Sequence, residues 1–331
     1  MRIKKSEQKT RKKTHTTLPT GLVFHPDYLK HDSGKDHPES ADRLCSIMTH
    51  LEKKGLLSRL KNIEPETAST EWLETVHDPS YIKMVERICK NGGGMLDPDT
   101  QVGLESYRIA LLAAGGVLAA VNEVMEQRTK NTFCAIRPPG HHAEKDRAMG
   151  FCIFNNVAVG ARYVQKRFGL NKVLIVDWDV HHGNGTQSIF WTDPSVFYFS
   201  IHQFPHYPGS GGENEVGEGE GEGFTFNMPM CAGSGELEYL EVFENILYPL
   251  AFKFSPDFIF ISAGFDAHEK DPLAQINLSE TGYKAMTEVM TTLASECCGG
   301  RLVSVLEGGY NLPSLSVSVE KHIRALMNKK E

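Results

Sequence analysis

The stretch V-L-I-V-D-W-D-V-H-H-G-N-G, from Val173 to Gly185, determines the fold that we expect. Its first four residues are apolar and mostly β-branched, which is typical of a strand buried on both faces of a parallel sheet. Two carboxylates and two imidazoles follow between Asp177 and His182. Ligands of open α/β sheets bind at the carboxyl ends of strands, so this strand is expected to end in a functional site.

The rest of the chain predicts the sheet around this strand. Short apolar runs alternate with longer helical patterns, as in a single α/β domain whose parallel sheet is covered by helices on both faces. Strands are expected at 21–25, 132–136, 172–176, 196–201, 257–262 and 301–306. Helices are expected at 39–54, 104–126, 155–168, 236–252, 279–296 and 315–328.

The charge of the chain is uneven. The 331 residues carry a formal net charge of −7, and the segment from Met1 to Lys13 contributes +6 from seven Lys or Arg and one Glu. The remaining 318 residues therefore carry −13. We expect residues 1–17 to form a basic, disordered tail that touches nucleic acid weakly at most, and residues 18–331 to form the catalytic domain. The acidic body disfavours a nucleic-acid-binding fold and suits a cationic substrate.

The composition also indicates the cellular environment in which we expect the protein. No apolar run reaches the roughly 18 residues of a membrane span, and the N-terminus has no apolar signal core, so we expect no membrane partner. The seven cysteines are odd in number and form no C-x-x-C pair, which favours reduced thiols. A cytoplasmic protein is expected, with a nuclear location and a homo-oligomer left open.

Residues 203–223 differ in amino-acid composition from the rest of the chain. Gly and Glu dominate, and no periodic apolar face exists. We expect a long loop, which serves either as the rim of a functional site or as a solvated surface segment.

Polar groups follow five of the expected strands, at 137–142, 177–182, 200–202, 264–266 and 307–310. Asp179 and His181 are two residues apart, so an extended backbone points both side chains to the same side. Asp266, at the end of another expected strand, is the best candidate for a third ligand of the same metal ion. Two carboxylates and one imidazole that leave positions open are typical of a catalytic zinc site, where the ion activates water and polarises a carbonyl.

A binuclear, ureohydrolase-like site is the alternative for these residues. It needs further bridging carboxylates, and the sequence has Gly183 and His268 at those positions. We therefore expect one catalytic metal ion per chain.

The segment R-P-P-G-H-H-A-E, from Arg137 to Glu144, supplies His141 and His142. Asp177 and Asn184 are the candidate partners of these two imidazoles. A carboxylate raises the basicity of an imidazole whereas an amide only orients it, so the two histidines should titrate differently and provide an acid and a base. Tyr310, in L-E-G-G-Y, is a candidate to donate a hydrogen bond to a developing oxyanion; the alternative is a tyrosine of the core.

Five motifs together resemble the histone deacetylase superfamily: R-P-P-G-H-H-A-E, G-F-C-I-F-N-N, D-W-D-V-H-H-G-N-G-T-Q, S-A-G-F-D-A and L-E-G-G-Y-N-L. The similarity runs from about Gly21 to Leu326, and Asn184 resembles the class II branch and its bacterial relatives. The resemblance implies the arginase/deacetylase fold, a mainly parallel eight-stranded sheet with helices on both sides.

The resemblance also implies a role for each matching residue. Asp179, His181 and Asp266 would bind Zn²⁺, and His142 would be the general base and later acid, oriented by Asn184. His141 would be an electrostatic helper paired with Asp177, and Tyr310 would polarise the acyl carbonyl. Structural K⁺ would bind at Asp177, Ser200 and Ile201. The substrate pocket would include Gly150, Phe151, Tyr207, Leu273 and Gly308, with His31 and Asp32 in a loop at its rim.

The expected function is zinc-dependent hydrolysis of the amide of Nε-acetyl-lysine in an acetylated protein or peptide, with release of acetate. An acetylpolyamine amidohydrolase is the first alternative. Leu273 stands where some polyamine-selective relatives carry an acidic gatekeeper, which favours the peptide substrate. The second alternative is a catalytically silent module that binds acetyl-lysine.

Overall fold

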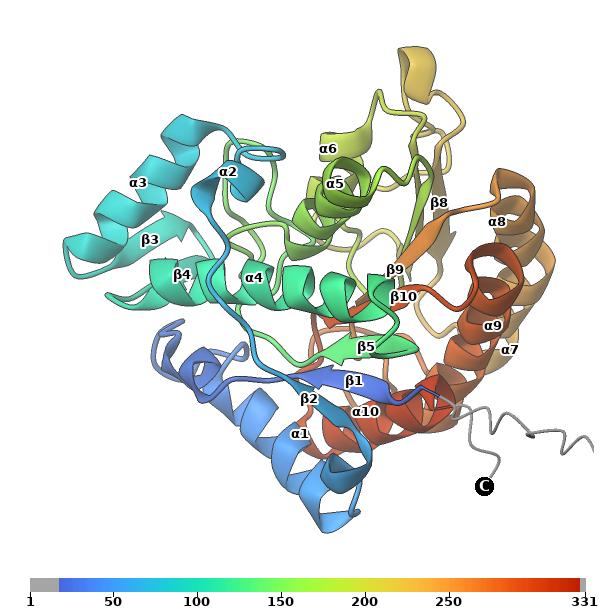
Figure 1. Cartoon of the computed structure of the whole chain (residues 1–331), viewed down its shortest axis with the longest axis horizontal. Helices are drawn as coiled ribbons and strands as arrows, with labels where there is room; N and C mark the ends of the chain where they lie inside the picture. Colours follow the sequence, from blue (N-terminus) through green and yellow to red (C-terminus); the bar gives the residue numbers. More distant parts are fainter. Residues whose placement is uncertain (1–17, 328–331) are drawn as a thin grey trace, which may run out of the picture.

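A parallel sheet of eight strands forms the centre of the domain (Figure 1). The computed structural model describes residues 18–327, and the predicted basic tail lies outside the described residues. The strand order is β2-β1-β5-β10-β9-β6-β7-β8, and all seven neighbouring pairs are parallel. The strands are β1 (Thr20–Val23), β2 (Lys61–Ile63), β5 (Asn131–Cys134), β6 (Val173–Asp177), β7 (Val196–Gln203), β8 (Thr225–Met230), β9 (Phe258–Ala263) and β10 (Leu302–Leu306).

Helices cover both faces of this sheet (Figure 1). One layer contains α1 (Ala41–Lys53), α7 (Glu236–Val242), α8 (Tyr248–Phe254), α9 (Glu280–Cys298) and α10 (Leu312–Leu326). The other contains α4 (Ser106–Met125), α5 (Asn156–Phe168) and α6 (Asn184–Phe190), with α2 (Thr70–Leu73) and α3 (Pro79–Lys90) packed against it. A small antiparallel hairpin joins β3 (Gly94–Asp97) to β4 (Thr100–Val102). The predicted α/β class and the eight-stranded sheet are confirmed.

All six predicted strands are present in the eight-stranded sheet, and its other two strands, β2 and β8, lie at its edges. The hairpin strands β3 and β4 were not predicted either. β2 has three residues, too few to show a pattern. β8 contains Pro229, which removes a backbone donor and is tolerated in an edge strand. The central β6 is buried along its whole length, in agreement with its continuous apolar sequence.

The six predicted helices are present as well, with one irregularity. The segment expected at 236–252 consists of α7, a π-helical turn at Phe243–Leu247, and α8, which ends at Phe254. The helices α2, α3 and α6 were not predicted. Among residues 18–327, α4 alone is long and apolar enough to cross a membrane, but 67% of that window is buried in the domain, where it packs on β1, β5 and β10.

The strand register brings the polar strand ends to one edge. Asp177, the last residue of β6, lies beside Ser200 of β7 and Ser262 of β9. The loops that follow β5, β6, β9 and β10 therefore leave the sheet side by side. This edge is where the sequence placed the functional site.

Candidate active site

Three side chains meet at this edge as a candidate cation site. Asp179 and His181 follow β6, and Asp266 follows β9. One ligand atom from each lies within 4.8 Å of the other two, and all three residues are buried. His181 Nδ1 lies 3.0 Å from Asp179 Oδ1 and 3.2 Å from Asp266 Oδ2.

The surroundings of this cluster fit a divalent cation. Asp266 Oδ2 is buried, and apart from its 3.2 Å contact with His181 Nδ1 it has no polar partner among the described residues. Burial, reinforced by the charge of Asp179, raises the pKa of the Asp266 carboxyl to about 7. A bound cation would satisfy this oxygen and offset the repulsion between the two carboxylates. One imidazole and two carboxylates match the donor set of a catalytic zinc site.

Gly308 closes the cluster from the β10 side. Its backbone N–H donates to Asp179 Oδ2 at 2.7 Å. A Cβ at this position would lie 2.0 Å from Asp266 Oδ2 and 2.6 Å from Asp179 Oδ2, so no larger residue fits without displacing the carboxylates. Gly308 therefore shapes the cation site, whereas the sequence placed it in the substrate pocket.

The two adjacent histidines have different partners, as the sequence predicted. His141 Nδ1 lies 3.1 Å from Asp177 Oδ2, and His142 Nδ1 lies 2.8 Å from Asn184 Oδ1. Burial opposes the charge of His141, but Asp177 and Asp179 raise its pKa to about 10. Burial, together with the charges of His141 and His181, holds the pKa of His142 well below its usual value. At neutral pH the pair thus consists of a cation and a neutral base.

Tyr310 lies next to these groups, on the segment that follows β10. Its backbone N–H donates to Asp271 Oδ2 at 2.7 Å, and the guanidinium of Arg43 lies 5.1 Å from the centre of its ring. Arg43 Nε also donates to the carbonyl oxygen of Gly309 at 2.8 Å. Burial raises the pKa of the Tyr310 phenol well above its usual value, so the hydroxyl stays protonated and can donate.

A narrow cavity of about 90 Å³ leads to this cluster and is called the tunnel below. Phe151 and Tyr207 belong to its lining, and each ring contacts a candidate catalytic residue. The ring of Phe151 lies 5.9 Å from that of Tyr310, and the ring of Tyr207 lies 5.2 Å from that of His142. The lining residues are Asp99, His142, Gly150, Phe151, His181, Tyr207, Leu273 and Tyr310.

Two residues assigned to the rim of the pocket lie elsewhere. The side chain of His31 is 1% exposed; its Nδ1 lies 2.9 Å from Ser106 Oγ and its Nε2 lies 3.6 Å from Glu39. Burial lowers the pKa of His31 to about 4, so this histidine is a neutral neighbour of the buried ion pair between Glu39 and Arg137. Asp32 is exposed beside Gly103 and is absent from the residues that line the tunnel. Both residues follow β1 in the first loop, where His31 turns into the domain and Asp32 faces solvent.

The residues expected to hold potassium are neighbours. Asp177 and Ser200 are register partners on adjacent strands, and Ile201 follows on β7. Ser200 Oγ lies 2.8 Å from His202 Nδ1, and the Asp177 carboxylate also accepts from the Tyr198 hydroxyl at 3.1 Å. The assignment of K⁺ to this position stays a prediction.

The binuclear alternative finds no support at His268. This side chain lies 3.5 Å from Glu280 rather than at the cation site. A Cβ at Gly183 would lie 2.2 Å from Asp177 Oδ2, so a carboxylate cannot replace this glycine without a shift.

Sequence reasoning missed three residues that shape the site. Asp99 lies in the turn between β3 and β4 and accepts from the Gly150 N–H at 3.0 Å. Arg43 arrives from α1, and Glu307 accepts from the N–H groups of Gly140 and His141. Arg43 belongs to a helical pattern and Asp99 to a turn-like D-P-D run, so neither carried a local signal. Glu307 belongs to the L-E-G-G-Y motif, but the sequence indicated no role for it.

The loop at 203–223 is only partly solvated. β7 extends through Gln203, and the loop then packs on α6. Glu215 accepts from Gln187 and from the N–H of Gly211 at 2.9 Å, and a Cβ at Gly221 would lie 2.5 Å from the carbonyl oxygen of Trp191. Tyr207 is therefore carried on a segment with fixed anchors.

The sequence and the fold of the chain are similar to those of known deacetylases. Residues 37–326 match the histone deacetylase domain family. The chain is 42% identical to a probable deacetylase of Archaeoglobus fulgidus, over 89% of this chain and 82% of that protein. It is 38% identical to a histone deacetylase-like amidohydrolase of Pseudomonas aeruginosa, over 89% and 77% of the two chains. The crystal structure of the HDA15 HD domain is similar with a TM-score of 0.91 at 40% identity, covering 95% of this chain and 89% of that one.

The parallel sheet and the paired histidines at its edge are those of an amidohydrolase of the deacetylase class. The chain belongs to the histone deacetylase family, which confirms the resemblance found in its motifs.

Proposed function

We propose that the chain hydrolyses the amide of Nε-acetyl-lysine in a protein or peptide, with one Zn²⁺ ion held by Asp179, His181 and Asp266. The observation that carries this proposal is the tunnel, because the same narrow cavity is lined by two aromatic walls and by His142, His181 and Tyr310. A tunnel of this kind accepts an unbranched alkyl chain and presents the amide at its end to polar groups.

The lining of the tunnel supports an acyl-lysine chain over a free polyamine. Phe151, Tyr207 and Leu273 give it apolar surface. The methylenes of a lysine side chain gain from such contact, whereas the secondary ammonium groups of a polyamine would be desolvated there. Asp99 is the only carboxylate among the residues that line the tunnel.

His142 is the proposed general base. Its neutral imidazole takes a proton from the water that attacks the acyl carbon, and it then gives that proton to the leaving lysine nitrogen as the C–N bond breaks. Acetate and the free amine are the products. His141 remains protonated beside Asp177 and stabilises the negative charge that develops.

Tyr310 is the proposed oxyanion donor. Its protonated hydroxyl is available in the tunnel, and Arg43 and Asp271 hold its ring and backbone. A bound zinc ion would supply Lewis acidity toward the carbonyl and lower the pKa of water to about 7. A structural K⁺ at Asp177, Ser200 and Ile201 is part of the same proposal.

The test compares kcat/KM for an acetyl-lysine peptide with kcat/KM for N-acetylspermidine on zinc-loaded protein. A strong preference for the peptide is expected. A strong preference for acetylspermidine would assign the enzyme to polyamine substrates instead. Zinc-loaded protein that binds the peptide but releases no acetate would contradict catalysis and support a silent binding module.

A further inference from the structure

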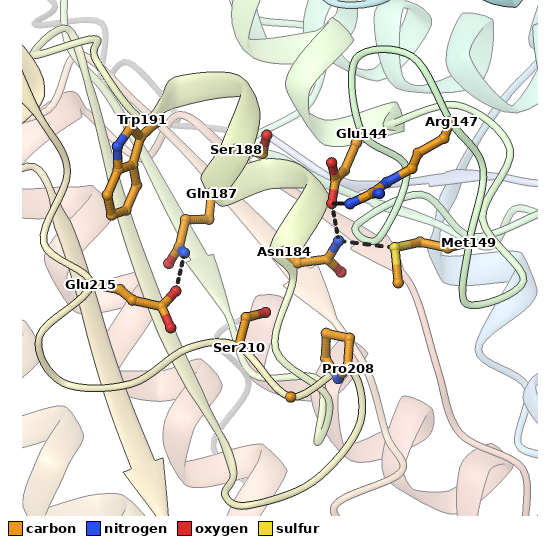
Figure 2. Close-up of a pocket in the computed structure, with 11 residues that line it drawn as sticks. Glu144, Arg147, Met149, Asn184, Gln187, Ser188, Trp191, Pro208, Ser210 and Glu215 are labelled. Atoms are coloured by element: carbon orange, nitrogen blue, oxygen red, sulfur yellow. Dashed lines mark hydrogen bonds and ion pairs between the residues drawn. The ribbon is translucent and has the colours of Figure 1, made fainter.

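A second cavity of about 570 Å³ lies beside the tunnel and is called the groove below (Figure 2). The segment at 207–210 separates the two, because Tyr207 lines the tunnel while Pro208, Gly209 and Ser210 line the groove. Glu144 and Asn184 also line the groove. Asn184, the partner of the proposed general base, thus lines the groove and not the tunnel.

A chain of contacts runs from His142 through Asn184 into this groove. Figure 2 shows the part of the chain that joins Asn184, Glu144 and Arg147. His142 Nδ1 lies 2.8 Å from Asn184 Oδ1, and Asn184 Nδ2 donates to Glu144 Oε1 at 2.7 Å. Arg147 Nη2 donates to the same Glu144 oxygen at 2.7 Å. The side chain of Glu144 is 17% exposed, whereas that of Arg147 is 62% exposed, so the carboxylate is the more enclosed partner of this ion pair.

The Glu144 carboxylate determines which end of the Asn184 amide faces His142. An ionised carboxylate only accepts hydrogen bonds, so it binds the amide NH₂ and repels the amide oxygen. The other neighbours of Asn184 Nδ2 are also acceptors, namely the Met149 sulfur at 3.1 Å and the His142 carbonyl oxygen at 3.5 Å. Asn184 Oδ1 is therefore directed at His142 Nδ1.

The amide orientation in turn sets the tautomer of His142. An oxygen acceptor at Nδ1 requires that Nδ1 carry the proton, which leaves Nε2 with a lone pair. A reversed amide would place the proton on Nε2, and the imidazole could not accept one from water there.

We propose that Glu144 is a positioning residue that acts through Asn184 to keep His142 in the tautomer needed for general-base catalysis. This inference rests on the proposed function, because it assigns His142 as the base. Arg147, which also lines the groove, donates a hydrogen bond to this carboxylate and so helps to hold it in place (Figure 2).

The kinetic test is Glu144→Ala in zinc-loaded protein. We expect kcat to fall by about 10- to 100-fold, the range for lost outer-shell partners of an active-site group. KM should change little, because Glu144 does not line the tunnel. Glu144→Gln retains an acceptor oxygen and should recover most of the rate. Glu105→Ala is the matched control, because Glu105 also pairs with an arginine three residues on, Arg108, but lies away from Asn184.

Two further measurements separate positioning from a structural role. In the Asn184→Ala background, Glu144→Ala should cause no additional loss of kcat. Histidine side-chain ¹⁵N NMR, with the His142 signals assigned by comparison with His142→Ala, should show protonated Nδ1 in the wild type and a mixture of tautomers in Glu144→Ala. An unchanged kcat, an additive loss in the Asn184→Ala background, or an unchanged tautomer would overturn the proposal. The NMR result needs no substrate, so failure of the proposed function would appear separately, as an inactive wild type with its tautomer intact.

Discussion

At the scale of single residues, the chemistry of the site depends on which partner each histidine has. Asp177 gives His141 a carboxylate, and Asn184 gives His142 an amide. The consequence is a charged imidazole beside a neutral one, with ring centres 4.0 Å apart. The pairing was predictable from sequence because all four residues lie at, or within ten residues after, the carboxyl end of β5 or β6.

Replacement of Tyr310 by Phe tests the oxyanion donor. We expect kcat for the acetyl-lysine peptide to fall by about 10²- to 10³-fold, the scale of one lost oxyanion-hole donor. The melting temperature should stay close to that of the wild type, because Phe keeps the ring that packs on Arg43 and Phe151. A rate near that of the wild type would remove Tyr310 from the mechanism.

Other residues of the site could not be predicted, for a physical reason. Asp99 and Arg43 reach the site from a hairpin turn and a helix that are distant in sequence. Their placement depends on how loops pack around the strand ends, which local patterns do not encode. His31 illustrates the converse, because a polar loop residue is held inward by Glu39 and Ser106.

At the scale of elements, the site is built from strand ends that a parallel sheet brings to one edge. The sequence predicted this edge because β5, β6, β7, β9 and β10 are apolar runs followed by polar groups. It did not predict β2 and β8, which are short or contain proline and lie at the sheet edges. Neither β2 nor β8 contributes a residue to the candidate cation site.

Gly308→Ala tests how closely the segment after β10 packs on the cation site. The added methyl group would meet Asp266 Oδ2 at 2.0 Å and Asp179 Oδ2 at 2.6 Å. We expect zinc affinity, measured by competition with a chelator, to weaken by at least about 10-fold. Gly235→Ala is the control, since its nearest neighbour would lie at 3.6 Å, an ordinary contact. Equal zinc affinity in the two variants would contradict the packing described here.

At the scale of the whole molecule, folding stability should depend on buried neutral histidines. Burial lowers the pKa of His322 to about 3 and that of His77 to about 4. Both would titrate near 6.5 in the unfolded chain. Between these values the unfolded state binds protons that the folded state does not, so stability falls as the pH drops below about 6.5.

His322→Gln tests this dependence in the core away from the tunnel. His322 is fully buried between Thr287 and Ser304, and its loss removes one proton-binding group of the unfolded state. Urea unfolding should show that the wild type loses about 2 kcal/mol more than this variant between about pH 7 and about pH 5. Equal losses in the two proteins would show that His322 does not contribute to acid sensitivity.

The measurement that tests the proposed function most directly is a zinc titration of chelated protein, with acetate release from an acetyl-lysine peptide as the readout. Because the three proposed zinc ligands, Asp179, His181 and Asp266, form a single cluster, we expect activity to be absent without metal and to saturate at about one zinc ion per chain. Full activity in the chelated protein, or no acetate at any zinc load, would contradict zinc-dependent amide hydrolysis at this site.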